Sequence, residues 1–406
     1  SGRGRRPALN ASTGALELRV PLTILVCTDI IQQDDEGGSG RVAWETAKQL
    51  ASVGHKVIVL TKGAPGRRYF EKSEGVEIYR YRTNPLNLFK AMREIKARHG
   101  RIDALDLHHP YTGLLARLAA PEVPCVYSFH SPWGEEFATR GAGLGYSRPR
   151  IWLGAWLRKK IEKAAISGCG VVFNASRFMA EKLKASHALE SRIEPLGVDV
   201  RKFTPAADRD AVRKRLGVAA DRPLVFTVRN LVDRMGLENL IEAAGTVVKK
   251  NSKALFVIGG RGYLREKLEA LISSAGLEEN VRLEGFIPDS ELQYYYQCAD
   301  LFVLPTAALE GFGLVTLEAL ACGTPVLATP VAANLEVLGG FKKEMLLKGA
   351  SGAEIAEGVL NFFEKDKRGV AELRAECRKF VEENYSWEKY AGIMETVLYE
   401  ISKGAP

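Results

Sequence analysis

Residues 304–326 read LPTAALEGFGLVTLEALACGTPV, and they place one glutamate on each side of a glycine-containing helix start. The apolar run 301–304 predicts a strand that ends in a loop, and the pattern after it predicts a helix from about Gly313. Glu310 therefore precedes the helix, and Glu318 lies in its second turn. The apolar face of this helix is expected to consist of Val315, Leu317, Leu320 and Ala321.

The spacing of the two glutamates favours a phosphate between them. At about 1.5 Å of rise per residue, their positions are about 12 Å apart along the helix axis. A glycosidase pair needs its carboxyl groups about 5 to 9.5 Å apart, so the two are not expected to form one. The free N–H groups and positive dipole end of the helix suit a phosphate or diphosphate. One carboxylate then remains on each side for hydroxyl groups, as a sugar–diphosphate–ribose ligand requires.

The element Glu310-x7-Glu318, with Gly-Phe-Gly inside it and Ala-Leu-Ala-Cys-Gly-Thr-Pro-Val behind it, resembles the donor site of retaining GT-B glycosyltransferases of family 4. The resemblance extends over most of the chain. It implies an α/β fold of the GT-B type, in which two Rossmann-like domains with parallel sheets face each other across a cleft. It also implies transfer of a hexose from a nucleotide diphosphate sugar to a hydroxyl of a glycan, a lipid-linked sugar or a small molecule, with retention at the anomeric carbon.

The same resemblance assigns roles within this element. Glu310 would hold the sugar hydroxyls and belong to the catalytic set, and Glu318 would hold the ribose. Retention would proceed by front-face attack, in which the leaving phosphate takes the acceptor proton. Further hydrogen bonds to sugar or phosphate would come from the backbone amides of Gly311, Phe312, Gly313 and Leu314. The alternative is a pair of structural glutamates on a helix packed in the core.

Strands and helices alternate twice along the 406 residues, which predicts two α/β domains with ligands at the carboxyl ends of their strands. The alternation restarts after residues 196–205. The strands are expected at 22–26, 56–60, 75–82, 124–128, 170–173, 224–228, 254–258, 281–284, 301–304 and 325–328. The expected parts are a disordered tail at 1–20, an acceptor-binding domain at 21–203, a nucleotide-sugar-binding domain at 204–385 and a helix at 386–406 that, in GT-B enzymes, crosses back to the first domain.

Composition narrows the class of protein. Hydrophobic residues make up 46% of the chain, yet no apolar run approaches the length of a membrane span, and no secretory signal is recognisable. The cysteines lack Cys-x-x-Cys spacing and are predicted to be buried free thiols in a reducing compartment. They are Cys27, Cys125, Cys169, Cys298, Cys322 and Cys377. The expected location is cytoplasmic, including peripheral attachment at the inner face of the membrane.

The charge is distributed unevenly. Residues 1–205 hold 32 Lys and Arg against 20 Asp and Glu, a net charge of +12, and the remainder carries −4. A basic half is attracted to an anionic surface or ligand. No recognition helix or aromatic RNP-type strand is recognisable, so nucleic acid is not expected as a partner, while anionic lipid and phosphorylated acceptors stay open.

The segment 148–163 combines Trp152 and Trp156, four positions apart, with clustered arginines and lysines. A basic amphipathic helix with tryptophan suits the face of an anionic membrane, which predicts peripheral contact with such a surface. The alternative is a helix whose aromatic face packs within the first domain.

Two motifs of the first domain are expected at the cleft. Gly37 and Gly38 open the first helix, where glycine lets backbone approach a ligand and a helix start favours anions, although a plain tight turn is the alternative. His130 follows the strand at 124–128. The family places a histidine at this point near the reacting carbon, so His130 is assigned to orienting the sugar or acceptor. His108 and His109 are interpreted as core or loop residues.

Two cations are expected to neutralise the diphosphate in place of a metal. The family usually has Arg-Leu-Val-x-x-Lys-Gly after the first strand of the second domain, whereas residues 229–236 read RNLVDRMG. The Arg-to-Lys spacing selects Arg229 and Arg234 as catalytic residues. Alignment on Leu-Val and the final glycine would instead place Asn230 and Met235 there. The first register is preferred because it keeps both charges, and a solvated surface pair is the alternative.

Two further loops of the second domain are expected beside the nucleotide. Gly259 and Gly260 end one strand, and Phe286 and Ile287 follow the next, where family members hold the base largely through backbone. Ordinary turn chemistry would also explain both loops. The pair Ala332-Ala333 departs from the family, in which Gly-Gly is common near this position.

Neither a metal nor a cofactor is expected. Asp208-Arg-Asp210 has the Asp-x-Asp spacing of metal–nucleotide sites in the other major glycosyltransferase fold, but capping and solvation of the helix at 210–216 explain it better. No zinc spacing, Walker A loop or Gly-x-Ser-x-Gly elbow occurs. Two other functions stay open: a glycogen-phosphorylase-like enzyme, for which no cofactor-lysine motif is recognisable, and a non-catalytic protein that binds nucleotide sugar or polyanions.

Overall fold

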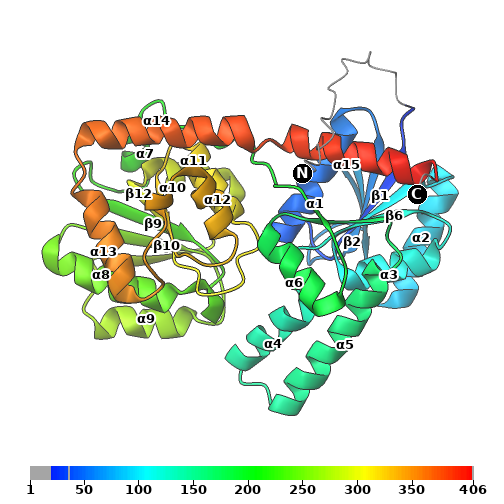
Figure 1. The fold of residues 1–406 in the computed structure, drawn as a ribbon, viewed down its shortest axis with the longest axis horizontal. Coiled ribbons are helices and arrows are strands. Elements are labelled where there is room, and N and C mark those ends of the chain that lie inside the picture. The colour runs from blue at the N-terminus through cyan, green and yellow to red at the C-terminus, as the bar shows by residue number, and fades with distance from the viewer. Residues whose placement is uncertain (1–19, 35–36, 405–406) are drawn as a thin grey trace, which may run out of the picture.

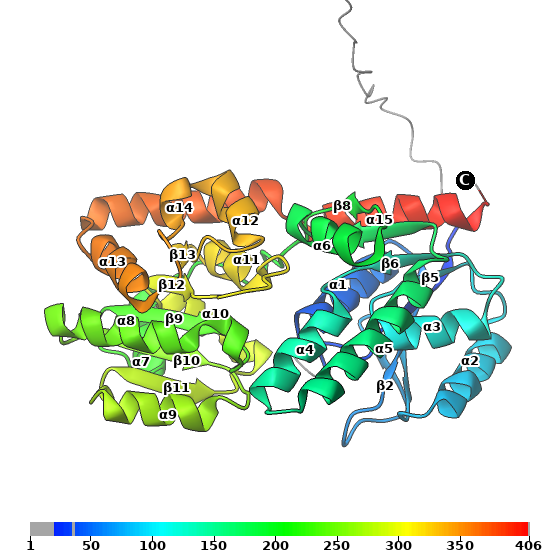
Figure 2. The ribbon, with the colours of Figure 1, turned by 60° about the horizontal axis from the view of Figure 1, so that its bottom comes forward.

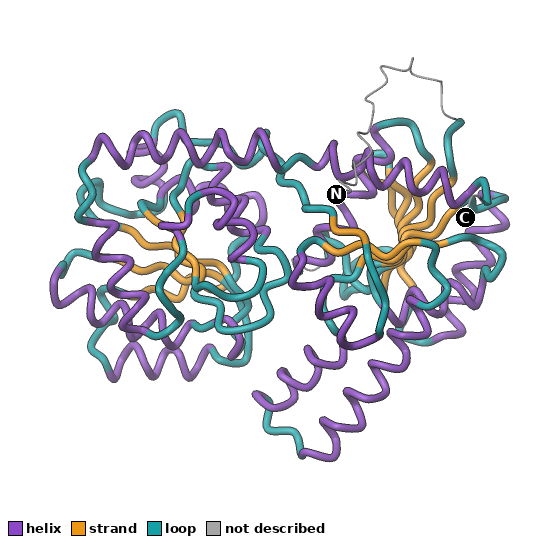
Figure 3. The backbone as a smooth tube through the Cα atoms, in the orientation of Figure 1, coloured by secondary structure: helices purple, strands orange, loops and turns teal. Residues whose placement is uncertain are grey.

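The computed structural model describes residues 20–34 and 37–404, which form two α/β domains lying side by side (Figure 1). Each domain has a central sheet with helices packed around it (Figure 3). The tail expected at 1–20 lies outside the described residues except for Val20.

The first sheet has the strand order β3-β4-β2-β1-β5-β6-β7-β8, and its neighbouring strands are parallel except for the β3–β4 hairpin. Ile24 and Val26 belong to one hydrophobic core, and Leu25 and Cys27 belong to the other. A parallel sheet covered on both faces requires such continuous apolar runs. The strands are β1 (Thr23–Cys27), β2 (Lys56–Lys62), β3 (Phe70–Ser73), β4 (Val76–Tyr81), β5 (Ala104–Leu107), β6 (Cys125–Ser128), β7 (Val171–Asn174) and β8 (Arg192–Ile193).

Two helices of the first domain start at side-chain caps. Asn84 accepts a hydrogen bond from the amide of Leu86 at the start of α2, and Ser176 does the same for α6 through Met179. The helices are α1 (Gly38–Ser52), α2 (Pro85–His99), α3 (Pro110–Ala119), α4 (Trp133–Gly143), α5 (Arg148–Ile166) and α6 (Arg177–His187).

The second sheet is parallel throughout its described strands, in the order β11-β10-β9-β12-β13. Its strands are β9 (Leu224–Val228), β10 (Leu255–Gly259), β11 (Val281–Gly285), β12 (Leu301–Leu304) and β13 (Val326–Ala328). The helices around it are α7 (Arg209–Arg215), α8 (Leu237–Lys250), α9 (Arg265–Ser274), α10 (Asp289–Cys298), α11 (Leu314–Ala321), α12 (Asn334–Phe341), α13 (Gly352–Phe363) and α14 (Lys367–Asn384), with 3-10 turns η1 (Asp233–Met235) and η2 (Lys343–Met345).

Both sheets contain a point where the order of strand addition reverses. In the first sheet this point lies between β1 and β5, and in the second between β9 and β12. Loops that leave two such strands diverge, and ligands of parallel sheets bind in the crevice between them. The residues that follow these four strands are therefore the first candidates for a site.

The chain crosses between the domains twice, and the two crossings run alongside each other. Val198 forms an isolated parallel bridge with Ser386, and a Cβ atom on Gly197 would lie 2.2 Å from the backbone nitrogen of Trp387. Beyond this point α15 (Trp387–Ser402) packs against α1 of the first domain (Figure 1). The last helix of the chain thus packs on the first domain.

Helices α4 and α5 form an antiparallel hairpin at one end of the first domain (Figure 2). Glycines allow the two helices to approach closely. A Cβ atom on Gly134 would lie 2.9 Å from the carbonyl oxygen of Ala155, and one on Gly154 would collide with the ring of Phe137. The hairpin is therefore fixed by backbone contact, and it leaves the outer side of α5 uncovered.

Sequence patterns predicted most of the sheet but missed β3, β5 and β8. Strand β5 has only four residues and contains Asp106, so it lacked the apolar run by which its neighbours were recognised. The omission matters because β5 borders the reversal point of the first sheet and carries His108 at its end.

Candidate functional site

Glu310 lies at the reversal point of the second sheet, in the loop that follows β12. Its Oε2 atom accepts a hydrogen bond of 2.5 Å from Nη2 of Arg229, the residue directly after β9. The hydroxyl of Thr306 donates to the same oxygen at 2.9 Å. The side chains of Glu310 and Arg229 are only 8% and 7% exposed. The structure therefore brings the predicted glutamate and the first predicted arginine into one buried ion pair.

Arg234, in η1 of the second domain, contacts both the Glu310 loop and the first domain. Its Nη1 atom donates to the carbonyl oxygen of Leu309 at 2.9 Å, and its Nη2 atom lies 3.2 Å from Oε1 of Glu136 on α4. Asn230 is exposed, whereas Met235 is buried with its sulfur 2.8 Å from Nη2 of Arg229. Both arginines therefore contact the Glu310 loop, Arg229 at the carboxylate of Glu310 and Arg234 at the carbonyl oxygen of Leu309.

The helix start between the glutamates has the backbone geometry that the glycines indicated. Gly313 has φ of 84° and is the N-cap of α11, a left-handed conformation that favours glycine. A Cβ atom on Gly311 would lie 3.2 Å from the carbonyl oxygen of His130, so this loop touches the first domain. Phe312 is buried, with its ring 5.9 Å from that of Tyr385, and Leu314 is half-buried. The side chain of Phe312 therefore packs in the protein, and only its amide remains a candidate for ligand contact.

Two non-glycine residues with positive φ surround Glu310. Leu309 has φ of 56°, and Ala332 has φ of 52°. The amide of Ala333 donates to the carbonyl oxygen of Glu310 at 3.3 Å, which connects the two segments. Strained backbone of this kind concentrates at functional sites. This chain thus has alanine at position 332, near which the family commonly has glycine, although the backbone there adopts a conformation that glycine adopts more readily.

Ala332→Gly is therefore expected to stabilise the protein by about 1 kcal/mol, because it removes the cost of a left-handed conformation. Ala333→Gly is the matched control: its φ is −67°, so added flexibility and a lost buried methyl group should destabilise the protein. Urea unfolding of both variants measures the difference. A lower free energy of unfolding for Ala332→Gly would contradict the assignment of strain to this position.

Glu318 is enclosed on α11 and is bound by both domains. The hydroxyl of Tyr296 donates to its Oε2 atom at 2.8 Å, and Arg41 of α1 forms an ion pair with its Oε1 atom. Arg41 also donates to Oδ1 of Asp289 at 2.7 Å, and Lys202 pairs with the other oxygen of that carboxylate. Burial raises the pKa of Asp289, but Arg41 and Lys202 outweigh it and hold the pKa below its usual value. Arg41 of the first domain thus forms an ion pair with Glu318, the carboxylate predicted to hold the ribose.

His130 is the end of a buried chain of polar groups in the first domain. Its Nε2 atom lies 3.1 Å from Nδ1 of His108, whose Nε2 atom lies 3.0 Å from Oδ2 of Asp106. The two imidazole rings stack at 5.3 Å. Burial, followed by the charges of His108 and His109, holds the pKa of His130 well below its usual range. His130 is therefore held as a neutral imidazole whose orientation is fixed by His108.

Asp29 and His109 occupy the reversal point of the first sheet, as Arg229 and Glu310 do in the second. Oδ1 of Asp29 lies 2.9 Å from Nδ1 of His109 and also accepts from the hydroxyl of Thr112. Burial raises the pKa of Asp29, but the hydrogen bond and charge of His109 outweigh it and lower the pKa. Asp29 was not among the predicted site residues, and His109 was interpreted as a core or loop residue. Asp29 lies two residues after β1, which was predicted, but His109 lies two residues after β5, which was not, so no signal in the sequence indicated that the two would meet.

The glycine-rich loops are explained in part by packing. A Cβ atom on Gly260, whose φ is 130°, would collide with the carbonyl oxygen of Arg229, and one on Gly259 would lie 2.5 Å from buried Ile287. These residues therefore allow the Arg229 loop to sit against β10. Phe286 is 40% exposed and carries the guanidinium of Arg261 at 3.8 Å from its ring centroid.

The Gly37-Gly38 pair and the Asp208-Arg-Asp210 motif each lie at the start of a helix. A Cβ atom on Gly37 would lie 2.8 Å from Ile30, whereas Gly38 has open space around its Cα. Gly38 is thus the glycine that leaves room at the start of α1. Asp208 caps α7 by accepting from the amide of Ala211 at 3.0 Å, as the capping interpretation predicted.

Two family models match the chain, one for each domain. Residues 36–202 match Glycosyltransferase Family 4, and residues 208–384 match Glycosyl transferases group 1. The chain belongs to the GT-B glycosyltransferases of the family 4 type. The predicted family and the predicted GT-B fold of two Rossmann-like domains are thereby confirmed.

Relatives with assigned activities fit this membership. A D-inositol 3-phosphate glycosyltransferase of Catenulispora acidiphila is 29% identical over 90% of this chain and 92% of its own length. A GDP-mannose-dependent phosphatidylinositol monomannoside mannosyltransferase of Mycolicibacterium smegmatis is 30% identical over 57% of this chain and 64% of its own. Among solved structures, sucrose-phosphate synthase from Thermosynechococcus elongatus has 22% identity and a TM-score of 0.76, covering 95% of this chain and all of that one. The lipopolysaccharide glycosyltransferase WaaG has 18% identity and a TM-score of 0.70, covering 91% of this chain and 99% of that one.

Proposed function

We propose that the protein transfers a hexose from a nucleotide diphosphate sugar to an acceptor hydroxyl, with retention at the anomeric carbon. The observation that carries this proposal is the buried Arg229–Glu310 pair beside the free helix start at Gly313. It places a cation, a carboxylate and the amides of a helix start that no side chain caps at the reversal point where parallel sheets bind ligands. The names of the relatives support a sugar donor and an acceptor that contains inositol or another polyol.

In this proposal Arg229 and Arg234 bind the diphosphate, and the amides of residues 311–314 share its charge. Glu310 holds hydroxyl groups of the transferred sugar, and Glu318 holds the ribose. The acceptor oxygen attacks the anomeric carbon on the face from which the diphosphate leaves. As the bond from that carbon to the phosphate oxygen breaks, the same oxygen takes the acceptor proton. Charge stabilisation by preorganised donors supplies the main lowering of the barrier.

The first domain supplies the acceptor side of the site. His130 reaches the Gly311 loop through its backbone, and its neutral imidazole can accept or donate a hydrogen bond to the sugar or acceptor. Asp29 and His109 lie after the two strands at the reversal point of this sheet, where they can bind acceptor hydroxyls. The acceptor is thus proposed to contact polar side chains of the first domain while the donor is bound by the second.

A panel of nucleotide sugars, incubated with the protein and read by release of UDP or GDP, tests this function. Release of one nucleotide in the presence of EDTA is the expected result, since arginines are proposed to replace a metal. A non-catalytic protein would bind a nucleotide sugar with the same selectivity and release nothing. Loss of release with chelator, restored by manganese, would contradict the metal-independent part of the proposal.

Arg41→Ala is expected to tighten nucleotide binding by about three- to tenfold, because Arg41 occupies the carboxylate proposed to hold the ribose. Lys48→Ala is the matched control: it removes a cation from the same helix that pairs with Glu45 and not with Glu318. Calorimetric titration with the released nucleotide measures both affinities. Weaker binding by Arg41→Ala alone would identify Arg41 as a direct ligand of the donor.

A further inference from the structure

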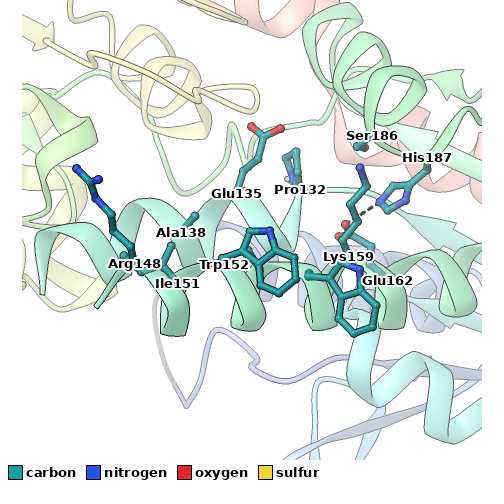
Figure 4. A pocket seen from close by; sticks show the side chains of 13 residues that line it. Pro132, Glu135, Ala138, Arg148, Ile151, Trp152, Lys159, Glu162, Ser186 and His187 are labelled. Carbon is teal, nitrogen blue, oxygen red and sulfur yellow. Dashed lines mark hydrogen bonds and ion pairs between the residues drawn. The ribbon is translucent and has the colours of Figure 1, made fainter. Parts of the chain in front are cut away.

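A groove of about 500 Å³ lies between α4, α5 and the end of α6, outside the site described above. Its walls are largely apolar and include Pro132, Ala138, Ile151 and Ala155, with Trp152 and Trp156 along one side. Figure 4 shows Ala138 near Ile151 and Trp152, whereas the carboxylate of Glu135 points away from Trp152. A volume of this size falls within the range of small-ligand sites.

The tryptophans of this groove are exposed. Trp152 is 68% exposed and Trp156 is 45% exposed, and Leu153 and Leu157 beside them are 49% and 45% exposed. The interpretation that packs the aromatic face of this helix within the first domain is therefore wrong. Contiguous exposed apolar side chains of this size mark an interaction surface.

The same helix is strongly cationic. Its exposed cations are Arg148, Arg150, Lys159, Lys160 and Lys163. Its single carboxylate, Glu162, is buried, where it accepts from the amide of Trp133 at 3.1 Å and lies 2.9 Å from Nε2 of His187. No carboxylate of α5 therefore offsets the exposed cations, and the charge of the helix is complementary to an anionic partner.

The groove lies near the acceptor side of the proposed site. Pro132, which lines it, follows His130 by two residues, and the ring of Trp133 lies 5.1 Å from that of His109. The loop that carries His130 thus leads directly into the wall of the groove. Along residues 20–34 and 37–404, no helix has the length and apolarity to cross a bilayer.

We propose that this groove binds a hydrocarbon chain of an anionic membrane lipid, and that the cations of α5 bind the headgroup region of the same membrane. The two contributions add, because one buried chain alone supports only marginal, reversible attachment and a polybasic surface strengthens it. That the lipid is also the acceptor rests on the proposed function. Membrane binding itself requires no glycosyl transfer and is tested without it.

Sedimentation with vesicles tests binding. The full chain should bind vesicles of phosphatidylcholine with one-third phosphatidylglycerol, bind pure phosphatidylcholine weakly, and lose affinity as salt rises. Trp152→Ala/Trp156→Ala should weaken binding by at least about tenfold. The control is Leu86→Ala, which removes another exposed apolar side chain, 75% exposed, from α2 of the same domain. Equal loss in the control, or no loss in the double variant, would overturn the proposal.

Two further measurements distinguish the groove from simple surface attraction. Phosphatidylglycerol brominated on its acyl chains should quench tryptophan fluorescence, and Trp152→Phe/Trp156→Phe should keep vesicle binding but lose the quenching. Ala138→Phe fills the groove and should weaken binding, whereas Ala142→Phe, exposed on the same helix, should not. Binding without quenching, or normal binding by Ala138→Phe, would overturn occupancy by a lipid chain. Tryptophan-dependent self-association without vesicle binding would also overturn it, in favour of a second copy of the protein.

The failure of this inference is separable from failure of the proposed function. The affinity for the released nucleotide, measured by calorimetry without vesicles, should be the same for Trp152→Ala/Trp156→Ala and for the unchanged protein because neither tryptophan lies at the donor site. Vesicle binding with no nucleotide release from any donor would refute the enzymatic proposal and leave the membrane site in place. Nucleotide release without vesicle binding would refute the membrane site alone.

Discussion

Arg229→Ala is expected to lower the rate of glycosyl transfer by a factor on the order of 10² or more, the scale of losing one preorganised electrostatic contact. The guanidinium follows β9 directly and is buried against Glu310, and Gly260 leaves the space that its backbone needs. Single-turnover kinetics with a donor identified by nucleotide release would measure the effect. Arg229→Lys should recover part of the rate, because a lysine keeps the charge but not the forked hydrogen-bonding geometry.

The same variant also changes stability, which requires a control. Removing Arg229 leaves Glu310 with Thr306 but without its cation, and breaking a buried pair costs about 3–5 kcal/mol. Arg229→Ala/Glu310→Gln should recover much of that stability while the rate stays low. A rate within about twofold of the unchanged protein for folded Arg229→Ala would exclude its proposed role, since a preorganised contact contributes far more.

Glu310→Gln and Glu318→Gln should affect different steps. Glu310 lies beside Arg229, the cation proposed to bind the diphosphate, and is proposed to hold the transferred sugar. Its loss should therefore lower turnover by a factor on the order of 10² while nucleotide affinity changes little. Glu318 is bound by Tyr296 and Arg41 at the far side of the helix start, so its loss should mainly weaken nucleotide binding. Measured turnover and nucleotide dissociation constants for both variants separate the two roles.

A conservative exchange at a third buried carboxylate serves as the control. Glu162 lies in the first domain, is bound by His187 and the Trp133 amide, and has no proposed contact with donor. Glu162→Gln should leave nucleotide affinity unchanged. Turnover and affinity like those of the unchanged protein in both Glu310→Gln and Glu318→Gln would remove the central assignment of the donor site.

Local chemistry made the second domain largely predictable. The run 304–326 contains a glycine whose φ is 84°, and this conformation starts α11 between the two glutamates as expected. Apolar runs identified its parallel strands because both faces of that sheet are covered. The preference for Arg229 and Arg234 rested on charge alone, and the structure adds the reason why Met235 is apolar: its side chain is buried beneath Arg229.

Contacts between distant segments were not predictable in the same way. Arg41 and Glu318 belong to different domains, and no spacing rule connects them. His108 reached His130 only because β5, a four-residue strand with an internal aspartate, lies beside β6. The exposure of Trp152 depended on glycine contacts that hold α4 to the other side of α5. Periodicity describes one element at a time, whereas these features depend on how elements pack.

The most direct test of the donor site is a crystal structure of the protein with the nucleotide sugar that it consumes. The diphosphate oxygens should lie about 2.7–3.1 Å from the guanidinium groups of Arg229 and Arg234 and from amides of residues 311–314. The ribose should replace Arg41 at Glu318, and the sugar should contact Glu310. A diphosphate bound elsewhere, or held through a metal ion with both arginines unengaged, would contradict the proposed mechanism.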